Sequence, residues 1–194
     1  TVASKLNDAG AILLGKLNMH PFAYGPTGEN EDYGHMHNPW NPNKLTGGSS
    51  GGSGSSVAIG QCSAALGSDT GGSVRIPAAL CGIVGFKPSY GKLSKFGVTP
   101  LSWSLDHPGP LTRTVEDSVL MLNAMNGYDA RDPVSVKTNT IPLDFINSPD
   151  ISNIKIGIPQ EFFEDIDDEM SALVQEAIEV LKSLGAQIKP VNFP

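Results

Sequence analysis

The sequence predicts an α/β protein, because a strand–helix–strand unit can be read near its C-terminal end. Residues 154–158 alternate apolar and polar side chains as a strand does, and residues 186–191 begin a second strand. Between them, residues 167–184 carry apolar side chains at three- and four-residue spacing, which indicates an amphipathic helix. Short apolar segments at 11–17 and 83–86 predict further buried strands.

The first half of the chain predicts short helices separated by long loops. Residues 1–9 have the pattern of a helix that ends before Gly10, and residues 56–66 predict another helix. Residues 18–45 and 92–113 are rich in proline and other loop-forming residues, so both segments are expected to be irregular. A connection as long as the first of them usually wraps a functional site.

A further helix is predicted over residues 115–126. Thr114 precedes it as a favourable N-cap, and Glu116 and Asp117 place negative charge in its first turn. Residues 129–153 are polar and interrupted by prolines, so they are expected to form a surface excursion.

Length and composition limit the classes of function. The 194 residues suit one domain, and the absence of an initiator Met suggests a piece of a longer protein. A net charge of −7 argues against a nucleic-acid surface. The sequence contains no apolar stretch of about 18 residues, so no membrane span is predicted and a cytoplasmic location is expected. Cys62 and Cys81 lie among small apolar residues, which favours buried thiols over a disulfide.

Residues 47–56 consist only of glycine and serine, which by composition indicates a flexible linker. A second glycine-rich turn follows at 67–73, and a helix is predicted over 74–80 with Ser73 at its cap. A serine there lies among unpaired N–H groups at the positive end of a helix dipole, which suits the charge that develops in acyl transfer. Proteolysis separates the two interpretations, since a linker would be cut and a buried site would resist.

Two patterns imitate cofactor sites. Residues 10–16 match the first part of a phosphate-binding loop, but Leu17 stands where Ser or Thr is required. His35 and His37 have a spacing that could suit a metal, yet no Cys or Glu-x-x-His partner accompanies them. Polar loop histidines are the favoured interpretation, and no cofactor or metal is expected.

Three segments together resemble the amidase signature family, which includes bacterial amidases, fatty acid amide hydrolase and the A subunit of glutamyl-tRNA amidotransferase. They are GGSSGGS, GSDTGGSVRIPAALCGIVGFKPSYG and SLDHPGPLTRTVED, and they occur in the family's order. The resemblance covers residues 1–133 well and the remainder loosely. It implies a mixed β-sheet core flanked by helices, of which residues 1–194 would form a single, partial domain.

The resemblance also implies a Ser–Ser–Lys triad. By motif, Ser73 would be the nucleophile that forms an acyl-enzyme. Ser49 would be the bridging serine that relays the proton, held by a cis peptide bond. Four N–H groups of the second turn would bind the oxyanion of the tetrahedral intermediate. They belong to Thr70, Gly71, Gly72 and Ser73.

Charged residues near the turn have other expected roles. Asp69 and Arg75 flank it, and a structural ion pair that braces the turn is expected. The family's base is a lysine in an upstream motif, and no lysine of this chain lies in that setting; Lys16 and Lys87 belong to other matched segments. The chain is therefore expected to lack the base and to be inactive by itself.

The leading functional hypothesis is an amidase that hydrolyses a carboxylic amide to acid and ammonia. The alternative is the A subunit of a tRNA-dependent amidotransferase, which passes ammonia from glutamine to a partner subunit. Residues 54–56 and His107 stand where that subunit has an alanine-rich segment and a glutamine, which favours the amidase. A non-catalytic binding module is the third alternative, if the full protein lacks the lysine. A small-molecule amide is the expected partner, with no direct nucleic acid or membrane contact.

Overall fold

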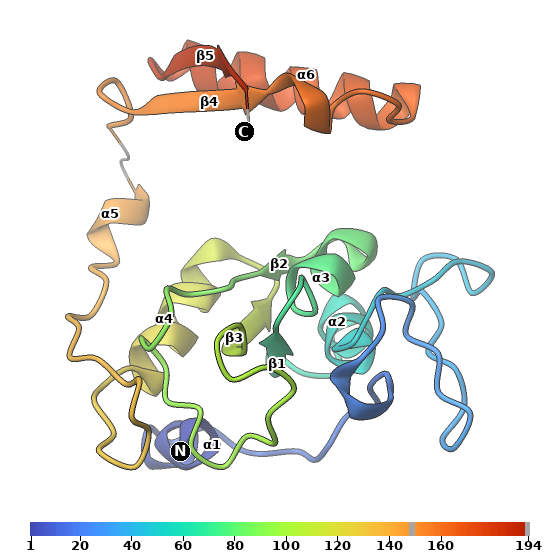
Figure 1. The fold of residues 1–194 in the computed structure, drawn as a ribbon, viewed down its shortest axis with the longest axis vertical. Coiled ribbons are helices and arrows are strands. Elements are labelled where there is room, and N and C mark those ends of the chain that lie inside the picture. The colour runs from blue at the N-terminus through green and yellow to red at the C-terminus, as the bar shows by residue number, and fades with distance from the viewer. Residues whose placement is uncertain (148–149, 193–194) are drawn as a thin grey trace. The chain divides into compact units, whose positions relative to one another are not determined.

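The computed structural model describes residues 1–147 and 150–192, in two compact units, Thr1–Leu143 and Asp144–Pro194 (Figure 1). Helices and strands occur in both units, which confirms the predicted α/β class. The expectation of a single domain stays a prediction.

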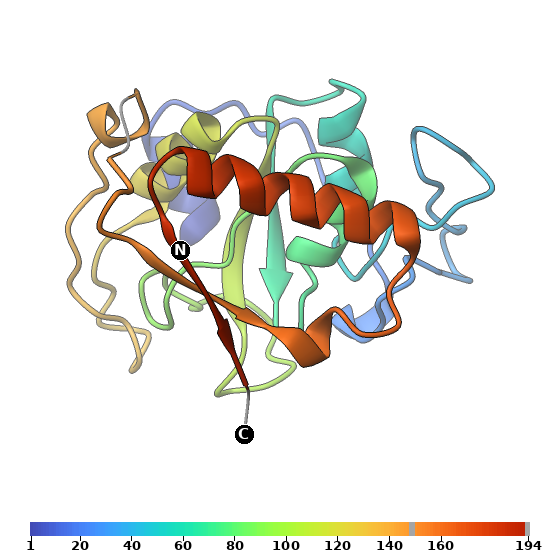
Figure 2. The same ribbon diagram turned by 90° about the horizontal axis from the view of Figure 1, so that it is seen from above.

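The first unit contains a three-stranded antiparallel sheet with helices packed on it. The strand order is β1-β3-β2, so β3 is central. Helix α2 contacts β1 and β3, and α3 contacts β2. Helix α4 contacts β3 and packs against α1 (Figure 1, Figure 2). The elements are α1 (Val2–Asp8), η1 (Pro21–Ala23), α2 (Gly51–Ala58), β1 (Ala64–Asp69), α3 (Arg75–Cys81), β2 (Val84–Gly85), β3 (His107–Thr112) and α4 (Val115–Met125).

Two apolar clusters form the core of this unit. One joins α1 to α4 through Val2, Leu122 and Met125, and includes Leu93. The other consists of Val74, Ala78 and Leu111, and it joins α3 to the central strand. Val74 is completely buried and directly follows Ser73, the last residue of the second glycine-rich turn (67–73). This second cluster therefore anchors that turn to the sheet.

The start of helix α4 agrees with the sequence-based prediction. The Thr114 side chain accepts a hydrogen bond from the Asp117 N–H at 3.0 Å, as expected of an N-cap. α1 ends at Asp8, close to the predicted end before Gly10. Among the helices of residues 1–147 and 150–192, none has the length and apolar character needed to cross a membrane.

The expectation that residues 92–113 are irregular is wrong for His107–Thr112, which form the central strand β3. Pro108 and Pro110 argued against a strand, because proline cannot donate a ladder hydrogen bond. The structure tolerates them because β2 pairs only with Leu111 and Thr112. The rest of β3 therefore has a single neighbour, β1, in the ladder.

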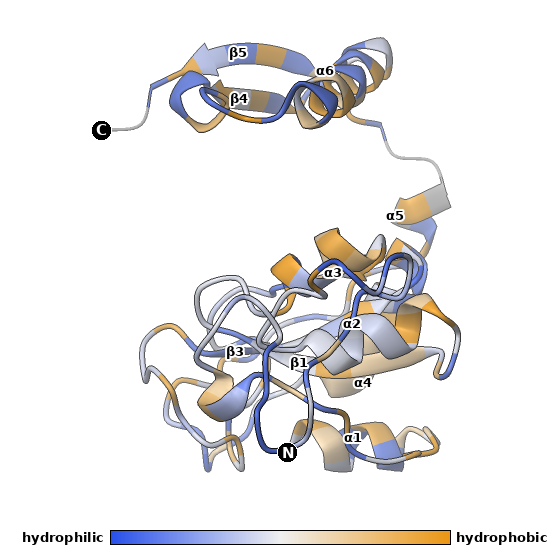
Figure 3. Cartoon of the chain, turned by 90° about the vertical axis from the view of Figure 1, so that its right-hand side faces the viewer, coloured by the Kyte–Doolittle hydropathy of each residue, from blue (hydrophilic) through white to orange (hydrophobic). Residues whose placement is uncertain are grey.

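The linker interpretation of residues 47–56 and the predicted helix over 56–66 are both wrong. The glycine–serine run itself forms helix α2, and residues 46–54 are all buried. Figure 3 shows α2 in pale, neutral colours beside the more hydrophobic α3. Glycine is a poor helix former, so close packing supplies the stability here. A Cβ atom on Gly52 would lie 2.4 Å from the backbone oxygen of Asn18.

We expect Gly52→Ala to destabilise the protein, although the same change in an exposed helix stabilises by about 1 kcal/mol. The new methyl group would meet the backbone O and N of Asn18 at 2.4 and 2.8 Å. Overpacking of this kind lowers the free energy of unfolding by about 1–3 kcal/mol. Denaturant titration measures it, with Gly15→Ala as the control because no atom lies within 4 Å of its added Cβ. A Gly52→Ala protein more stable than the wild type would contradict this packing.

The predicted buried strand at residues 11–17 is also wrong. Ile12, Leu13 and Leu14 are 85%, 78% and 74% exposed, and the segment has no regular secondary structure. A strand requires a neighbour to receive its N–H and C=O groups. Within the described residues no segment forms a ladder with this one, so its apolar pattern alone does not make a strand.

The second unit confirms the predicted strand–helix–strand arrangement. β4 and β5 are parallel, with Lys155 opposite Gln187, and α6 connects them. Asp167 caps α6 by accepting hydrogen bonds from the N–H groups of Glu169 and Met170. The elements are α5 (Asp144–Asn147), β4 (Lys155–Pro159), η2 (Gln160–Phe162), α6 (Asp168–Ser183) and β5 (Gln187–Val191).

Candidate functional site

The two glycine-rich turns lie against each other in the first unit. The Ser50 N–H donates a hydrogen bond to the backbone oxygen of Ser73 at 3.1 Å. The Ser50 hydroxyl accepts one from the Ser68 N–H at 3.3 Å. These bonds join the residue after Ser49 to both β1 and the second turn, so segments far apart in the sequence meet at their backbones.

Ser49 has an unusual environment. The Gly48–Ser49 peptide bond is cis, and Ser49 is completely buried. Its backbone oxygen accepts a hydrogen bond from the His20 N–H at 3.0 Å. Its hydroxyl oxygen has no hydrogen-bond partner among the described residues. Buried polar groups are nearly always paired, and a catalytic role is one recognised reason for an exception.

Ser73 lies between β1 and α3 and is only partly buried. Gly72 has a φ of +129°, a conformation that favours glycine. A Cβ atom added to Gly71 would meet no atom within 4 Å, so the outer side of the turn is open. A small molecule can therefore approach the turn from the Gly71 side.

The side chain that binds the N–H groups at the start of helix α3 is Asp69 and not Ser73. Its carboxylate is completely buried and accepts hydrogen bonds from the N–H groups of Val74 and Arg75 at 3.2 and 3.4 Å. The same carboxylate accepts one from the Gly72 N–H at 2.9 Å. The prediction that Ser73 caps the helix is therefore corrected, because the helix begins at Arg75 and its N-cap residue is Val74.

The ion pair expected between Asp69 and Arg75 is present. The Arg75 Nε and Nη2 atoms each lie 3.0 Å from a carboxylate oxygen of Asp69. Burial acts to raise the pKa of Asp69, but the hydrogen bonds from Arg75 and the Val74 N–H outweigh it, so the pKa lies below its ordinary value. The carboxylate is thus ionised near neutral pH and holds the turn by charge-assisted hydrogen bonds.

Not all four N–H groups expected to bind an oxyanion are available. The Gly72 N–H is already donated to Asp69. Those of Thr70, Gly71 and Ser73 have no acceptor within the part of the chain that the structure describes. Three of the four N–H groups are therefore available, within the described residues, to donate to a ligand oxygen.

Two charged side chains at the turn were not predicted. Lys87 Nζ lies 3.6 Å from Asp69 Oδ1, and the Asp106 carboxylate accepts a hydrogen bond from the Thr70 hydroxyl. Both residues belong to segments that carry the family resemblance, FKPSYG and SLDHPGP. The resemblance could therefore have identified both residues as candidates from the sequence. The residue that each side chain contacts, however, depends on the packing of β1, β2 and β3.

The two cysteines are free thiols. Cys81 is completely buried, and burial raises the pKa of its thiol to about 11. Cys62 is partly buried, and burial raises its pKa as well. Neither thiol is activated as a nucleophile, because that requires a lowered pKa.

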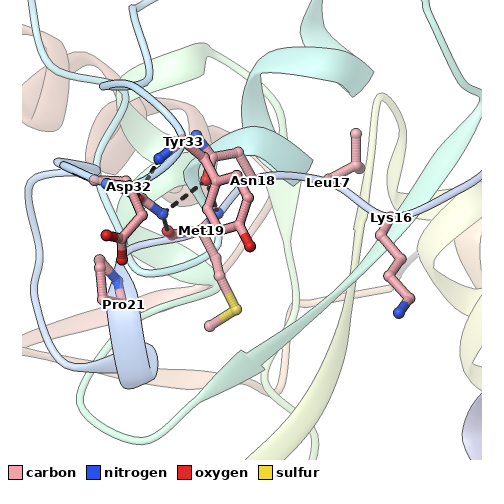
Figure 4. A pocket seen from close by; sticks show the side chains of 8 residues that line it. Lys16, Leu17, Asn18, Met19, Pro21, Asp32 and Tyr33 are labelled. Carbon is pink, nitrogen blue, oxygen red and sulfur yellow. Dashed lines mark hydrogen bonds between the residues drawn. The ribbon is translucent and has the colours of Figure 1, made fainter.

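The first unit has cavities of about 310 and 540 Å³. The smaller includes Asp106 in its lining, the residue whose carboxylate accepts a hydrogen bond from the Thr70 hydroxyl. The larger, of about 540 Å³, includes neither serine in its lining. Figure 4 shows its lining side chains, among them Asn18, whose side-chain oxygen accepts a hydrogen bond from Asn30 Nδ2 at 2.9 Å. The larger cavity is lined by Lys16, Leu17, Asn18, Met19, Pro21, Asn30, Asp32 and Tyr33.

Comparison with known proteins finds similarity along the whole chain. The family model described as Amidase matches residues 1–194. The A subunit of glutamyl-tRNA(Gln) amidotransferase from Syntrophus aciditrophicus is 47% identical over 196 residues, covering 100% of this chain and 40% of the relative. The protein of the same name from Carboxydothermus hydrogenoformans is 48% identical, also covering 100% of this chain and 40% of its own length.

The chain is also similar to solved structures of proteins with these and related names. The A subunit of the same amidotransferase from Thermotoga maritima superposes with a TM-score of 0.95 at 41% identity, covering 100% of this chain and 43% of that one. The peptide amidase from Stenotrophomonas maltophilia has a TM-score of 0.86 at 33% identity, covering 100% and 41%. The chain thus spans about 40% of the length of the curated relatives it matches.

Proposed function

The chain belongs to the Amidase family, and from this premise we propose that it carries the serine residues of an amide hydrolase. The reaction is hydrolysis of a carboxylic amide to an acid and ammonia. One observation supports this most directly: the buried hydroxyl of Ser49, which has no hydrogen-bond partner in the described part of the chain, lies in a turn that is hydrogen bonded to Ser73. A relay between two serines requires these two turns to lie side by side.

In the proposed mechanism, the Ser73 oxygen attacks the amide carbonyl carbon, and its proton passes through the Ser49 hydroxyl to a base. The carbonyl oxygen becomes an oxyanion, which the free N–H groups of the second turn stabilise. Collapse of the tetrahedral intermediate breaks the C–N bond, and the nitrogen leaves as ammonia after receiving a proton. Water then hydrolyses the Ser73 ester. The donors are Thr70, Gly71 and Ser73; the Gly72 N–H instead holds the turn to Asp69.

The base is, by family resemblance, a lysine outside residues 1–194, so the isolated chain is expected to be inactive. Lys87 Nζ lies 3.6 Å from Asp69 Oδ1, so Lys87 is assigned to the ion pairs that surround Asp69 and not to the role of the base. Asp69, Arg75 and Lys87 are instead proposed to hold the turn in shape.

A second candidate is the A subunit of an amidotransferase, in which the same serine releases ammonia from glutamine for a partner subunit. Identities of 47–48% to relatives of that name favour it, against the contrary indication from residues 54–56 and His107. Copurification of stable partner subunits with the full-length protein, and glutamine hydrolysis that depends on them, would distinguish it from a stand-alone amidase. A cytoplasmic location remains a prediction.

Labelling with a fluorophosphonate tests the assignment of the nucleophile. The full-length protein is expected to be modified at a single serine, in the peptide that contains Ser73, because the probe reacts only with an activated hydroxyl. Ser73→Ala should abolish the label. Ser63→Ala is the control, since Ser63 is exposed and lies just before β1. Labelling of another serine, or unchanged labelling of Ser73→Ala, would overturn the assignment.

A further inference from the structure

We propose that Asp106 is a positioning residue for the second turn, and that it acts through the hydroxyl of Thr70. The proposal rests on the function above, because it concerns how the turn presents its N–H groups to an oxyanion. It assigns the segment 104–107 (SLDH) to the machinery of the turn, although Thr70 and Asp106 are separated by 36 positions in the sequence.

The antiparallel pairing of β1 and β3 brings these two residues together. The last pair of the ladder is Asp69 opposite His107. Thr70 follows Asp69 and Asp106 precedes His107, so the two residues are the next to face each other beyond the ladder. There the Thr70 hydroxyl donates a hydrogen bond to Asp106 Oδ1 at 2.5 Å.

Asp106 is itself held firmly. It is 5% exposed, and its Oδ2 accepts a hydrogen bond from the Leu101 N–H at 2.8 Å. Both carboxylate oxygens also accept from the Ser102 N–H, at 3.0 and 2.9 Å. With these partners fixed, the carboxylate cannot rotate without breaking several hydrogen bonds. It therefore offers Thr70 a rigid anchor.

The second turn is consequently fixed at both ends by buried carboxylates. Asp69 holds the Gly72 N–H at one end, and Asp106 holds the Thr70 hydroxyl at the other. The Gly71 N–H lies between these two attachments, and the Thr70 N–H belongs to the residue whose hydroxyl Asp106 holds. Donors stabilise an oxyanion well only when they are oriented before the charge develops. Loss of the Thr70 attachment would leave the first donor free to move relative to Ser73.

A direct contact between Asp106 and substrate is the competing explanation, since Asp106 lines the cavity of about 310 Å³. The two roles predict different kinetics. A positioning residue affects stabilisation of the transition state, which lowers kcat, whereas a residue that binds substrate uniformly raises KM.

The test uses Thr70→Val, which removes the hydroxyl and keeps the shape, with Thr70→Ser as the conservative variant that retains it. In the full-length protein we expect Thr70→Val to lower kcat about 10- to 100-fold, since small misplacements of catalytic groups have effects of this size. KM should change less than about threefold, and Thr70→Ser should keep kcat within about threefold of the wild type. Asp106→Asn should lower kcat in the same way, and combining it with Thr70→Val should add little further loss.

All rates are referred to the concentration of folded protein, determined from the thermal unfolding signal. Asp106→Asn serves as the second route if Thr70→Val does not fold. The proposal is overturned if the folded Val or Asn variants keep kcat within twofold, if KM rises while kcat stays constant, or if Thr70→Ser is impaired as much as Thr70→Val. Those outcomes leave the role of Ser73 intact, whereas an active Ser73→Ala enzyme would remove the proposed function itself.

Discussion

Ser73→Ala in the full-length protein should lower kcat/KM for amide hydrolysis by about 10⁴-fold or more, since removal of a serine nucleophile can cost about 10⁶-fold. The variant keeps the N–H groups of the turn, so a small residual rate from oxyanion binding is expected. Its free energy of unfolding should change by less than about 0.5 kcal/mol, because the side chain lies on a partly exposed turn. Ammonia release measures the activity.

Ser63→Ala again provides the control and should keep the wild-type rate, since Ser63 is exposed and lies outside both turns. If Ser73→Ala retained a tenth of the wild-type activity while folded, the nucleophile would have to be another residue. Such a result would leave the fold and the family membership unchanged and would remove only the mechanism.

Ser49→Ala has the second largest expected effect, and it combines lost activity with unchanged stability. Without the relay the hydrolysis rate should fall about 10²- to 10⁴-fold, the range typical of proton transfer by a positioned group. The Ser49 hydroxyl is buried and has no hydrogen-bond partner among the described residues, so it does not stabilise the fold. Removing such a hydroxyl, so that the side chain becomes a methyl group, should leave the free energy of unfolding unchanged or raise it.

Ser53→Ala is the matched control, because Ser53 is also buried and belongs to the same glycine–serine run. Its hydroxyl donates a hydrogen bond to the Leu66 backbone oxygen at 2.8 Å. Losing that bond should lower the free energy of unfolding by about 1 kcal/mol or more, with little effect on the rate per folded molecule. The relay would be contradicted if Ser49→Ala behaved like Ser53→Ala, destabilised but active.

The features predicted correctly from sequence depend on short-range signals. The cap of α4 at Thr114 and the amphipathic pattern of α6 involve residues a few positions apart. The same holds for the ion pair between Asp69 and Arg75, which closes across one tight turn. The motifs containing Ser49 and Ser73 were also recognised locally, by their resemblance to a family, and the roles that the resemblance implies for these serines stay predictions. All of these are local in the chain.

The features missed depend on contacts between segments far apart in the chain. Helix α2 is stable in a glycine-rich run because Gly52 packs on the Asn18 backbone, and composition alone indicates a linker there. Strand β3 contains prolines that are acceptable only because β2 is short. The apolar segment 11–17 remains unpaired because a strand needs a neighbour as well as apolar side chains.

By itself, the sequence determined the α/β class, the starts of helices α4 and α6 and the two candidate serines, since each depends on neighbouring residues or on a motif. Only the tertiary structure decided how the second turn is held. The pairing of β1 with β3 brings Asp106 to Thr70, and the fold of the turn commits the Gly72 N–H to Asp69. The physical reason is that hydrogen-bond partners of buried groups are chosen by three-dimensional proximity, which a linear sequence does not specify.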